Sequence, residues 1–371
     1  MSGPAVLIVG GSGLAGGYIA SALLDSPEAS VVLGARDARR LERAAAELAS
    51  KYGTDRIATV VVDASDPDSL KRAAVGAQLV VLAAQAKQHG AAIGRAALDA
   101  GADVIDITLS TGEHHPMGPL RAEAAAAGHC LVTDAGLVPG LPSLLVRLAA
   151  GRLDRLDTAF VGITSSNKDG WPDNTVAELV ADLAHPPTFV WRDGAWRRSR
   201  LLGMADRRKF DFGPGWGKRT CGPVLVEEMR ELPGLFPSLQ QAGTFIANNA
   251  FVDSVALPVA MILTRLAPRR GQRPATRLVG WGMRRFARAP FGGVLKVEAS
   301  GERSGAPKDI SVTVSHPNEY QATGLVLAAF VAQWVDGPAT PARTPGLHPM
   351  GTIVEPERFM QDLAASGFIV S

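Results

Sequence analysis

Residues 5–20 read AVLIVGGSGLAGGYIA, and this stretch decides the fold. Five consecutive apolar residues predict a strand that is buried on both faces, and the segment from residue 14 predicts a helix. Between them lies a G-x-G-x-x-G motif, formed by Gly11, Gly13 and Gly16. A strand that passes through such a turn into a helix is the context in which this motif binds a dinucleotide.

The three glycines have distinct expected roles, because none of them carries a Cβ atom. Gly11 permits a tight turn, Gly13 lets the backbone approach a pyrophosphate, and Gly16 lets helix and strand pack closely. The helix N-terminus then offers unpaired N–H groups to the phosphates. The alternative is a glycine-rich turn without a ligand. The predicted cofactor contacts of this turn are Gly11, Ser12, Gly13, Leu14, Ala15 and Gly16.

Similar apolar runs alternate with alanine-rich helical patterns up to about residue 135. The runs lack polar alternation, which indicates a parallel sheet that helices cover on both faces. We therefore predict an α/β fold with an N-terminal Rossmann domain, a doubly wound parallel sheet, over residues 1–148. Strands are predicted at residues 5–9, 31–36, 58–63, 79–84, 103–108 and 129–135.

The strand pattern changes after about residue 150. Segments such as VLKVEASGE (294–302) and KDISVTVSH (308–316) alternate polar and apolar residues across a turn signal, which is typical of hairpins. We therefore predict an α+β second domain with a largely antiparallel sheet over residues 149–337, for substrate binding or dimerisation. Within it we expect a helical insertion at about 224–290, and we expect the tail 338–371 to pack back on the first domain.

The end of the second strand selects the cofactor. An NAD site usually has an Asp or Glu there to bind the ribose 2′-hydroxyl, whereas this strand ends in Arg36. A guanidinium pairs well with a 2′-phosphate, so NADP(H) is the predicted cofactor. The alternative is that Arg36 is a solvated residue at a helix start. The ends of strands three and four supply further predicted contacts, with packing as the alternative role: Asp63, Ala64, Ala84 and Gln85.

Composition limits the location and the partners of the chain. The formal net charge is only +2, so no nucleic-acid partner is expected. The N-terminus lacks the basic segment of a signal peptide, and the two cysteines, Cys130 and Cys221, form no metal-ligand or disulfide pattern. These features predict a cytoplasmic protein without a metal site, and we expect a homodimer.

Eight arginines occur within residues 265–288, a segment that contains no acidic residue. Trp281, Met283 and Phe286 lie among them. We interpret this segment as a solvated helix over the substrate cleft. The alternatives are a site for an anionic substrate or carrier protein and, less expected, a membrane surface.

Several segments form a recognisable set: VGGSGLAGGYIA (9–20), VVLGAR (31–36), HGAAIGRAALDAGADVIDIT (89–108) and AGHCLVTDAGLVPGLPSLLV (127–146). They resemble the saccharopine dehydrogenase/saccharopine reductase-like family of NADP-binding oxidoreductases. Two segments near the C-terminus, 319–337 and 346–368, share a weaker likeness to the tail of that family. The resemblance implies hydride transfer between NADPH and a C=N bond that links an amine to an aldehyde or keto acid. No pair of arginines matches the family's substrate carboxylate clamp, so saccharopine itself is not the expected substrate.

Ligands of a doubly wound sheet lie beyond the carboxyl ends of its strands. The loop after the fifth strand has one carboxylate and two histidines, of which one histidine is a candidate proton donor. The alternative is a polar loop that caps the next helix. The candidate catalytic residues are Glu113, His114 and His115. The turn after the sixth strand, Val138-Pro139-Gly140, is predicted to press against the nicotinamide. The candidate substrate contacts are Lys168, Trp216 and Tyr320.

Three functional hypotheses follow. The leading one is an NADPH-dependent reductase of imines, because an iminium carbon is already electrophilic and needs mainly positioning and the exclusion of water. The second is an enoyl reductase that acts on a carrier- or lipid-bound substrate. The third is a non-catalytic NADP-binding module.

Overall fold

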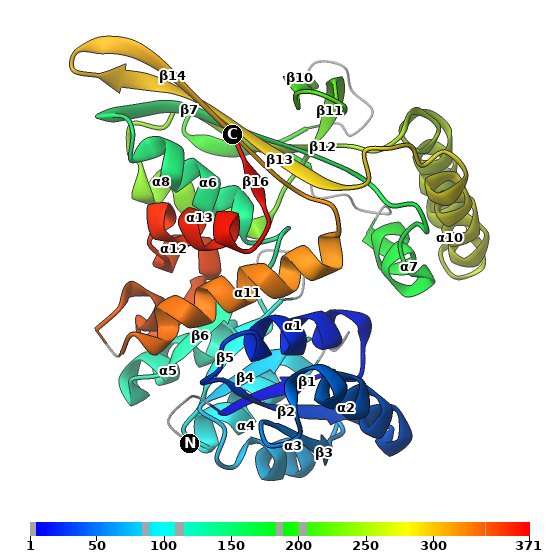
Figure 1. Ribbon diagram of the computed structural model, residues 1–371. Helices are drawn as coiled ribbons and strands as arrows, with labels where there is room; N and C mark the ends of the chain where they lie inside the picture. Colours follow the sequence, from blue (N-terminus) through cyan, green and yellow to red (C-terminus); the bar gives the residue numbers. More distant parts are fainter. Residues whose placement is uncertain (1–4, 84–88, 108–114, 183–187, 200–205, 338) are drawn as a thin grey trace. The chain divides into compact units, whose positions relative to one another are not determined.

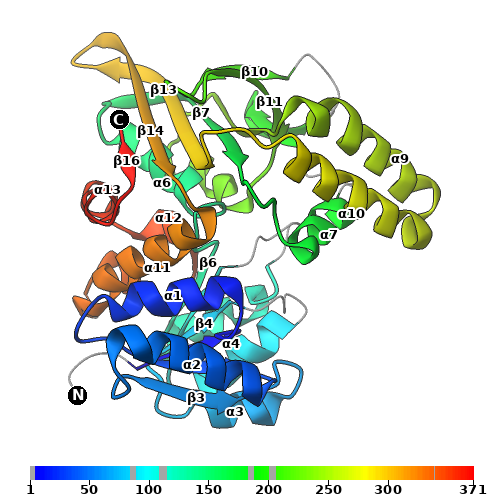
Figure 2. The same cartoon turned by 45° about the vertical axis from the view of Figure 1, so that its right-hand side comes forward.

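The computed structural model describes residues 5–83, 89–107, 115–182, 188–199, 206–337 and 339–371. The chain divides into two compact units (Figures 1 and 2). Unit 1 consists of Met1–Leu144 and Tyr320–Ser366, and unit 2 consists of Leu145–Glu319 and Gly367–Ser371. Unit 2 is therefore inserted into the chain of unit 1, and the residues Gly367–Ser371 belong to unit 2 again.

Unit 1 is built on a seven-stranded sheet in the order β15-β6-β5-β4-β1-β2-β3. All neighbouring strands are parallel, and the strand order reverses between β1 and β4. This confirms the predicted doubly wound sheet. Its strands are β1 (Ala5–Val9), β2 (Ser30–Ala35), β3 (Ile57–Val61), β4 (Leu79–Leu82), β5 (Asp103–Asp106), β6 (Cys130–Thr133) and β15 (Gly346–Pro349).

Helices cover both faces of this sheet, as the uninterrupted apolar strands require. One face packs its buried residues against α3 (Pro67–Ala74), α4 (Gly90–Asp99) and α5 (Arg121–Ala127) in a continuous core. On the other face lie α1 (Leu14–Leu24) and α2 (Ala38–Tyr52). Right-handed crossovers in opposite directions from β1 place the helices in this way.

Helix α11 (Glu319–Val335) packs on α1 within unit 1 (Figure 1). A Cβ atom at Gly324 would lie 2.7 Å from the backbone oxygen of Tyr18, so the contact depends on a residue without a side chain. The boundary between the units therefore falls near residue 320, whereas the sequence analysis placed it at 337. A long apolar helix can pack on either unit, and its sequence pattern does not show which of the two it contacts.

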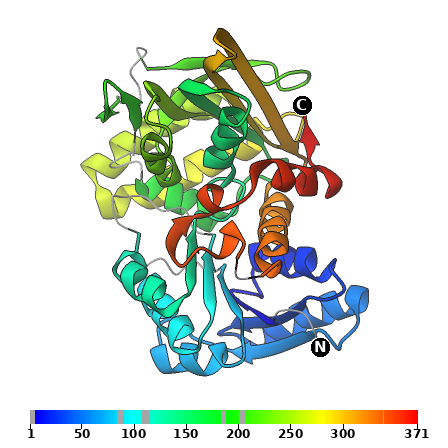
Figure 3. The ribbon, with the colours of Figure 1, turned by 90° about the vertical axis from the view of Figure 1, so that its left-hand side faces the viewer.

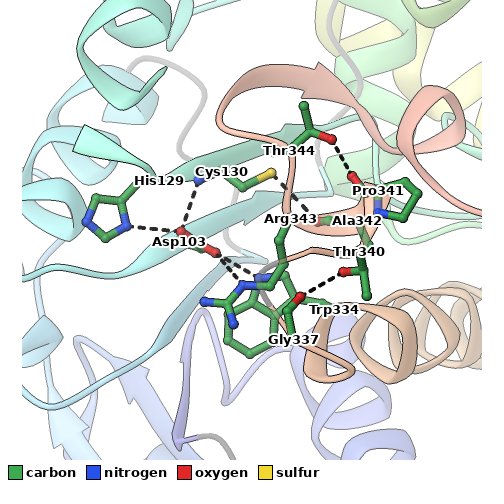
Figure 4. A network of polar contacts seen from close by, with 10 residues as sticks. All are labelled: Asp103, His129, Cys130, Trp334, Gly337, Thr340, Pro341, Ala342, Arg343 and Thr344. Carbon is green, nitrogen blue, oxygen red and sulfur yellow. Dashed lines mark hydrogen bonds and ion pairs between the residues drawn. The ribbon is translucent and has the colours of Figure 1, made fainter. Parts of the chain in front are cut away.

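The C-terminal tail closes the sheet of unit 1. β15 pairs with β6 as an edge strand, and α12 (Met350–Ile353) and α13 (Pro356–Ala365) follow it. At this edge the buried carboxylate of Asp103 forms the network in Figure 4. Its Oδ1 accepts from the backbone N–H of Cys130 at 3.0 Å and lies 3.1 Å from His129 Nδ1.

The other oxygen of Asp103 holds the C-terminal segment. Trp334 Nε1 donates to Oδ2 at 2.8 Å, and Arg343 Nε lies 3.7 Å from the same oxygen. The Arg343 guanidinium also lies over the Trp334 ring, 4.3 Å from its centroid. One carboxylate thus joins β5 and β6 to two residues more than 200 positions later.

Unit 2 contains a second, mixed sheet in the order β10-β11-β12-β7-β13-β14-β16, with β8 and β9 attached at β12. All its pairs are antiparallel except that of β7 with β12, which confirms the predicted, largely antiparallel sheet. Figure 3 shows the red C-terminal strand beside the hairpin of β13 and β14. The strands are β7 (Arg155–Ser166), β8 (Phe189–Arg192), β9 (Ala195–Arg198), β10 (Arg208–Asp211), β11 (Lys218–Val224), β12 (Gln241–Ala247), β13 (Gly292–Arg303), β14 (Ala306–His316) and β16 (Ile369–Val370).

The predicted helical insertion at 224–290 is only partly helical. β12 lies within it and pairs with both β7 and β11, so it is an interior strand of the sheet. Its sequence, QAGTFIA, has few of the β-branched residues that mark strands, and its neighbours determine its conformation. The helices of unit 2 are α6 (Leu141–Ala150, which begins in unit 1), α7 (Asp173–Asp182), α8 (Leu232–Leu235), α9 (Leu257–Leu266) and α10 (Pro268–Arg285). Among the described helices, none combines the length and hydropathy that a membrane span requires.

Candidate functional site

The glycine-rich turn between β1 and α1 has the geometry of a phosphate-binding loop. The backbone N–H groups of Gly10 and Gly11 both donate to Gly34 O of β2, at 2.7 and 3.0 Å. Helix α1 begins after Gly13, and no side chain caps its first turn within the described residues. The first N–H groups of this helix have no partner inside the helix, so they can serve an anion.

The three motif glycines differ in how much space surrounds them. A Cβ at Gly16 would lie 2.3 Å from Gly10 O, and one at Gly11 would lie 2.9 Å from Leu33 Cα. A Cβ at Gly13 would meet only Gly10 O, at 3.1 Å. Gly11 and Gly16 therefore allow the turn to pack on β2 and α1, whereas Gly13 is exposed on the open side of the loop. The positive φ of the turn, 96°, belongs to Gly10.

Arg36 and Asp63 follow the neighbouring strands β2 and β3 and lie near one another. Arg36 is exposed, and the next residue, Asp37, caps α2 by accepting from Arg40 N. The pKa of Asp63 is lowered mainly by hydrogen bonds from the backbone N–H and hydroxyl of Ser65, and also by the charge of Arg36. The first acidic residue after β2, Asp37, thus serves as a helix cap. Arg36 therefore remains as the charged side chain at the end of this strand.

Two other predicted cofactor contacts, Ala84 and Gln85, lie outside the described residues. Ala64 packs against the apolar core beside α3 and α4. This contact agrees with the packing role that the sequence left open for it.

Of the three candidate catalytic residues, Glu113 and His114 lie outside the described residues. The His115 side chain is 10% exposed, and its Nε2 lies 3.2 Å from Asp106 Oδ2 at the end of β5. Among the residues that the structure describes, Nε2 makes no hydrogen bond, although it faces this carboxylate oxygen. His115 Nδ1 accepts from the backbone N–H of Met117 at 3.1 Å. In the neutral ring the proton therefore resides on Nε2, beside the carboxylate.

The turn after β6 is compact and buried. Gly140 has a φ of 128°, and a Cβ there would lie 2.3 Å from Gly136 O. Pro139 is buried, and Val138 is half-buried. The segment is held at the carboxyl end of β5, where Ala135 N donates to Asp106 O at 3.1 Å. Val138-Pro139-Gly140 thus forms a close-packed turn beyond the carboxyl ends of the strands of unit 1. The phosphate loop lies at the same end of the sheet.

Unit 2 contains a cavity of about 310 Å³ at the carboxyl ends of its parallel strands β7 and β12. Its lining combines amide and hydroxyl groups, two guanidinium groups and three aromatic rings. The lining residues are Ser165, Ser166, Asn167, Gly170, Trp171, Arg219, Asn248, Asn249, Ala250, Phe251, Met283, Phe286, Ala287 and Arg288. The volume falls at the lower end of the range of small-molecule sites.

Arg219 is the best-positioned charged group of this cavity. Its Nε donates to Trp216 O at 3.3 Å and its Nη1 donates to Asn248 O at 3.4 Å. Asn248 is fixed in turn by Asp253, which accepts from its backbone N–H and its Nδ2. Burial raises the pKa of Asp253. Two backbone carbonyls therefore orient the guanidinium, and within the described residues no carboxylate pairs with it.

The predicted substrate contacts do not line this cavity. Lys168 and Trp216 are neighbours of residues that do, namely Asn167 and, through the Trp216 carbonyl, Arg219. Tyr320 lies at the start of α11 and belongs to unit 1. The chain around Trp216 therefore reaches the cavity through Arg219 and not through the Trp216 side chain.

Residues 6–132 match the family model of the saccharopine dehydrogenase NADP binding domain. The fold is similar to that of apo histidine-tagged saccharopine dehydrogenase (L-Glu forming) from Saccharomyces cerevisiae, with a TM-score of 0.68 and 14% identity over 100% of this chain and 99% of that chain. A meso-dapdh mutant with DAP from Clostridium tetani E88 has a TM-score of 0.49 and 10% identity over 96% and 95% of the two chains. For the C. glutamicum DAP dehydrogenase in complex with DAP, the TM-score is 0.46 and the identity 14% over 98% and 99%.

The family match confirms the resemblance noted in the sequence, and it confirms NADP(H) as the cofactor. At 14% identity the yeast structure shows that the fold is shared over the whole chain. The residues of this site suit NADP(H). An uncapped helix N-terminus follows the glycine-rich turn, and Arg36 stands where a 2′-phosphate requires a cation.

Replacing Arg36 with alanine is expected to weaken NADPH binding by about ten- to a hundredfold, since a charge-assisted hydrogen bond contributes about 1.5–3 kcal/mol. NADH binding should change little, because NADH has no 2′-phosphate. Titration of both cofactors into the wild type and the variant measures this effect. Equal affinities of the wild type for NADPH and NADH would contradict the assigned role of Arg36.

Proposed function

Because residues 6–132 match the saccharopine dehydrogenase NADP binding domain and the fold is shared with a saccharopine dehydrogenase, we propose that the chain uses NADPH to reduce a C=N bond formed from an amine and a carbonyl compound. Bound NADPH supplies the hydride, and the protein supplies binding, orientation and the exclusion of water. The phosphate loop and Arg36 hold the adenosine and phosphate groups in this proposal. The cavity of unit 2 receives the substrate.

The observation that carries the proposal is the chemistry of the cavity lining. Its polar side chains are those of serine, asparagine, tryptophan and arginine, and none of these titrates near neutral pH. A carbonyl or an enoyl group needs a proton as it accepts a hydride, whereas a protonated imine already carries it. The carboxylate of Glu319 lies behind this lining, where it accepts from Asn167 and Trp171. Among the described residues the cavity wall itself is therefore made of hydrogen-bond donors and aromatic rings, which suits an iminium substrate.

The aromatic residues of the cavity support the same assignment. Trp171, Phe251 and Phe286 line it, and the rings of Phe251 and Phe286 are stacked with centroids 4.7 Å apart. Aromatic faces attract a cation such as an iminium. Arg219, by contrast, suits an anionic group elsewhere on the same substrate.

The position of His115 agrees with a reaction that does not need it as a proton donor. One ring nitrogen accepts from the backbone N–H of Met117, and the other faces the carboxylate of Asp106. This arrangement places the residues that lead into the next helix beside the end of β5. We propose that His115 is a positioning residue at this strand end, whereas the alternative offered by the sequence was a polar loop that caps the next helix.

A second candidate is an enoyl reductase that acts on a lipid-bound substrate. One observation favours it: apolar side chains on α9 and arginines on α9 and α10 are exposed together. Such a surface suits a substrate that is presented at an anionic interface.

The proposal predicts NADPH oxidation with at least one amine–carbonyl pair and none with enoyl thioesters. The measurement follows the loss of NADPH absorbance with a panel of amines mixed with keto acids or aldehydes. Arg219→Gln should raise KM for an anionic substrate by about tenfold or more and leave kcat within a few fold, because it removes a binding contact. Arg198→Gln, at an exposed arginine of β9, is the matched control.

Turnover with enoyl thioesters alone would reject the imine proposal in favour of the second candidate. Tight NADPH binding without turnover in either panel would instead indicate a non-catalytic module. An equal KM for Arg219→Gln and the control would remove the cavity from the substrate site.

A further inference from the structure

Helices α9 and α10 form a helical hairpin in unit 2 (Figure 2). Their inner faces share an apolar core with α7, which includes Val176, Met261 and Val279. Near the turn the helices approach closely, since a Cβ at Gly271 would lie 2.2 Å from Leu263 O. The hairpin therefore buries one face within unit 2 and presents another to solvent.

Exposed aliphatic side chains form a stripe along α9 and the helical turn that precedes it, Val252–Ala256. Val255, Val259, Ile262 and Leu266 are 43%, 37%, 56% and 81% exposed. Their spacings of four, three and four residues place them on one side of the helix. Scattered apolar residues are normal on a surface, but a continuous stripe that ends in a residue as exposed as Leu266 marks a site of contact.

Cationic side chains accompany this stripe. All eight arginines of the segment 265–288 are exposed, and the segment contains no acid. Within the described residues only Arg284 forms an ion pair, with the exposed Asp173 at 3.4 Å. The arginines are Arg265, Arg269, Arg270, Arg273, Arg277, Arg284, Arg285 and Arg288.

The charge is concentrated most strongly at the tip of the hairpin. Arg265 precedes Leu266, and Arg269, Arg270 and Arg273 follow within two turns of α10. Seven of these arginines lie on α9 and α10, and their charge exceeds the formal net charge of +2 for the whole chain, so the rest of the chain is net negative. The hairpin is thus the part of the molecule that an anionic surface would attract.

Other occupants fit this surface less well. A symmetric contact with a second copy would bring the same arginines face to face. A nucleic acid would use the arginines but leave the aliphatic stripe in water, because its phosphate backbone offers no apolar partner. An anionic lipid surface matches both features: acyl chains accept the aliphatic side chains, and headgroup phosphates accept the guanidinium groups.

We propose that the tip of the α9–α10 hairpin docks on anionic lipid, with Ile262 and Leu266 entering the interface and the arginines contacting headgroup phosphates. The sequence alone did not favour a membrane surface, because periodicity does not show which face of each helix is buried. The proposal does not rest on the reductase activity, and its test uses no substrate.

Co-sedimentation of the full chain with vesicles tests the proposal. At physiological salt the protein should bind vesicles of equimolar phosphatidylcholine and phosphatidylglycerol but not vesicles of phosphatidylcholine alone. Arg269→Glu with Arg273→Glu should weaken binding at least about thirtyfold, since each basic residue near such a surface contributes about a fivefold factor. The matched control is Arg43→Glu with Arg121→Glu, which makes the same charge change at exposed arginines of unit 1.

A third variant tests the aliphatic stripe. Ile262→Ser with Leu266→Ser should weaken binding and make the remaining binding more sensitive to salt, because only the screened electrostatic part persists. Thermal melting of each variant should match the wild type, since the altered side chains are exposed. Absent binding to the anionic vesicles, or equal binding by the hairpin and control charge variants, would overturn the proposal. Binding unaffected by the serine variant would also overturn it and would indicate an acidic macromolecule as the partner.

Discussion

Replacing Gly13 with valine is expected to weaken NADPH binding by at least about a hundredfold, or close to 3 kcal/mol, and to leave the apo fold intact. The loop itself tolerates the change. Gly13 has φ −87° and ψ 169°, an extended conformation that valine adopts readily. Its added Cβ would meet only Gly10 O, at 3.1 Å. The rest of the side chain would extend into the open side of the loop, where the backbone must approach the pyrophosphate.

Titration of NADPH by calorimetry measures the loss, and thermal melting of the apo protein checks the fold. Gly17→Ala is the matched control, because a Cβ at Gly17 meets nothing within 4 Å. This change should preserve binding and stabilise α1 by up to about 1 kcal/mol. Gly16 would be a poor choice, since a side chain there collides with Gly10 and disturbs the fold. Normal NADPH binding by Gly13→Val would mean that this turn does not hold the cofactor.

Replacing Asp103 with alanine is expected to lower the stability of the protein by about 3–5 kcal/mol, the usual cost of removing one partner of a buried ion pair. The side chain is 5% exposed. Its removal leaves the Trp334 indole N–H and the Cys130 amide without their acceptor and leaves Arg343 without its counter-ion (Figure 4). For a unit of this size the melting temperature should fall by roughly 10 °C.

Two comparison variants distinguish the loss of this hydrogen-bond network from the general effect of removing a carboxylate. Asp99→Ala removes an exposed pair with Lys71 and should cost no more than about 1 kcal/mol. Trp334→Phe keeps an apolar ring but loses one hydrogen bond, so its cost should be intermediate, about 1–2 kcal/mol. Equal melting temperatures for Asp103→Ala and Asp99→Ala would show that the tail is held by other contacts.

The sequence predicted the first six strands of unit 1 and the phosphate loop because both depend on local signals. Uninterrupted apolar runs identify doubly buried strands, and glycines at fixed spacing identify a turn. β15 was missed for the opposite reason. Its four residues, GLHP, have no strand pattern of their own, and they form a strand because β6 presents an unpaired edge.

The candidate sites show the same division. Arg36 is defined by its place after the second strand, so sequence position alone predicts it as a cofactor contact. Arg219 does not stand out in the sequence, because its orientation depends on the carbonyls of Trp216 and of Asn248, which lies on the segment after another strand. Likewise, His115 looked like a free proton donor until its two ring nitrogens were seen beside Asp106 and Met117.

The interleaved chain path has a consequence for synthesis on the ribosome. Unit 1 receives its edge strand β15 from residues 346–349, and unit 2 receives β16 from residues 369–370. The first sheet is therefore complete only after residue 349 has left the exit tunnel, and the second only after residue 370 has left it. The N-terminal half must wait, with the β6 edge open, while the whole of the inserted unit is translated. The two units thus cannot be completed one after the other in the order of synthesis, and the unpaired edge of β6 is exposed to non-native strand pairing in the meantime.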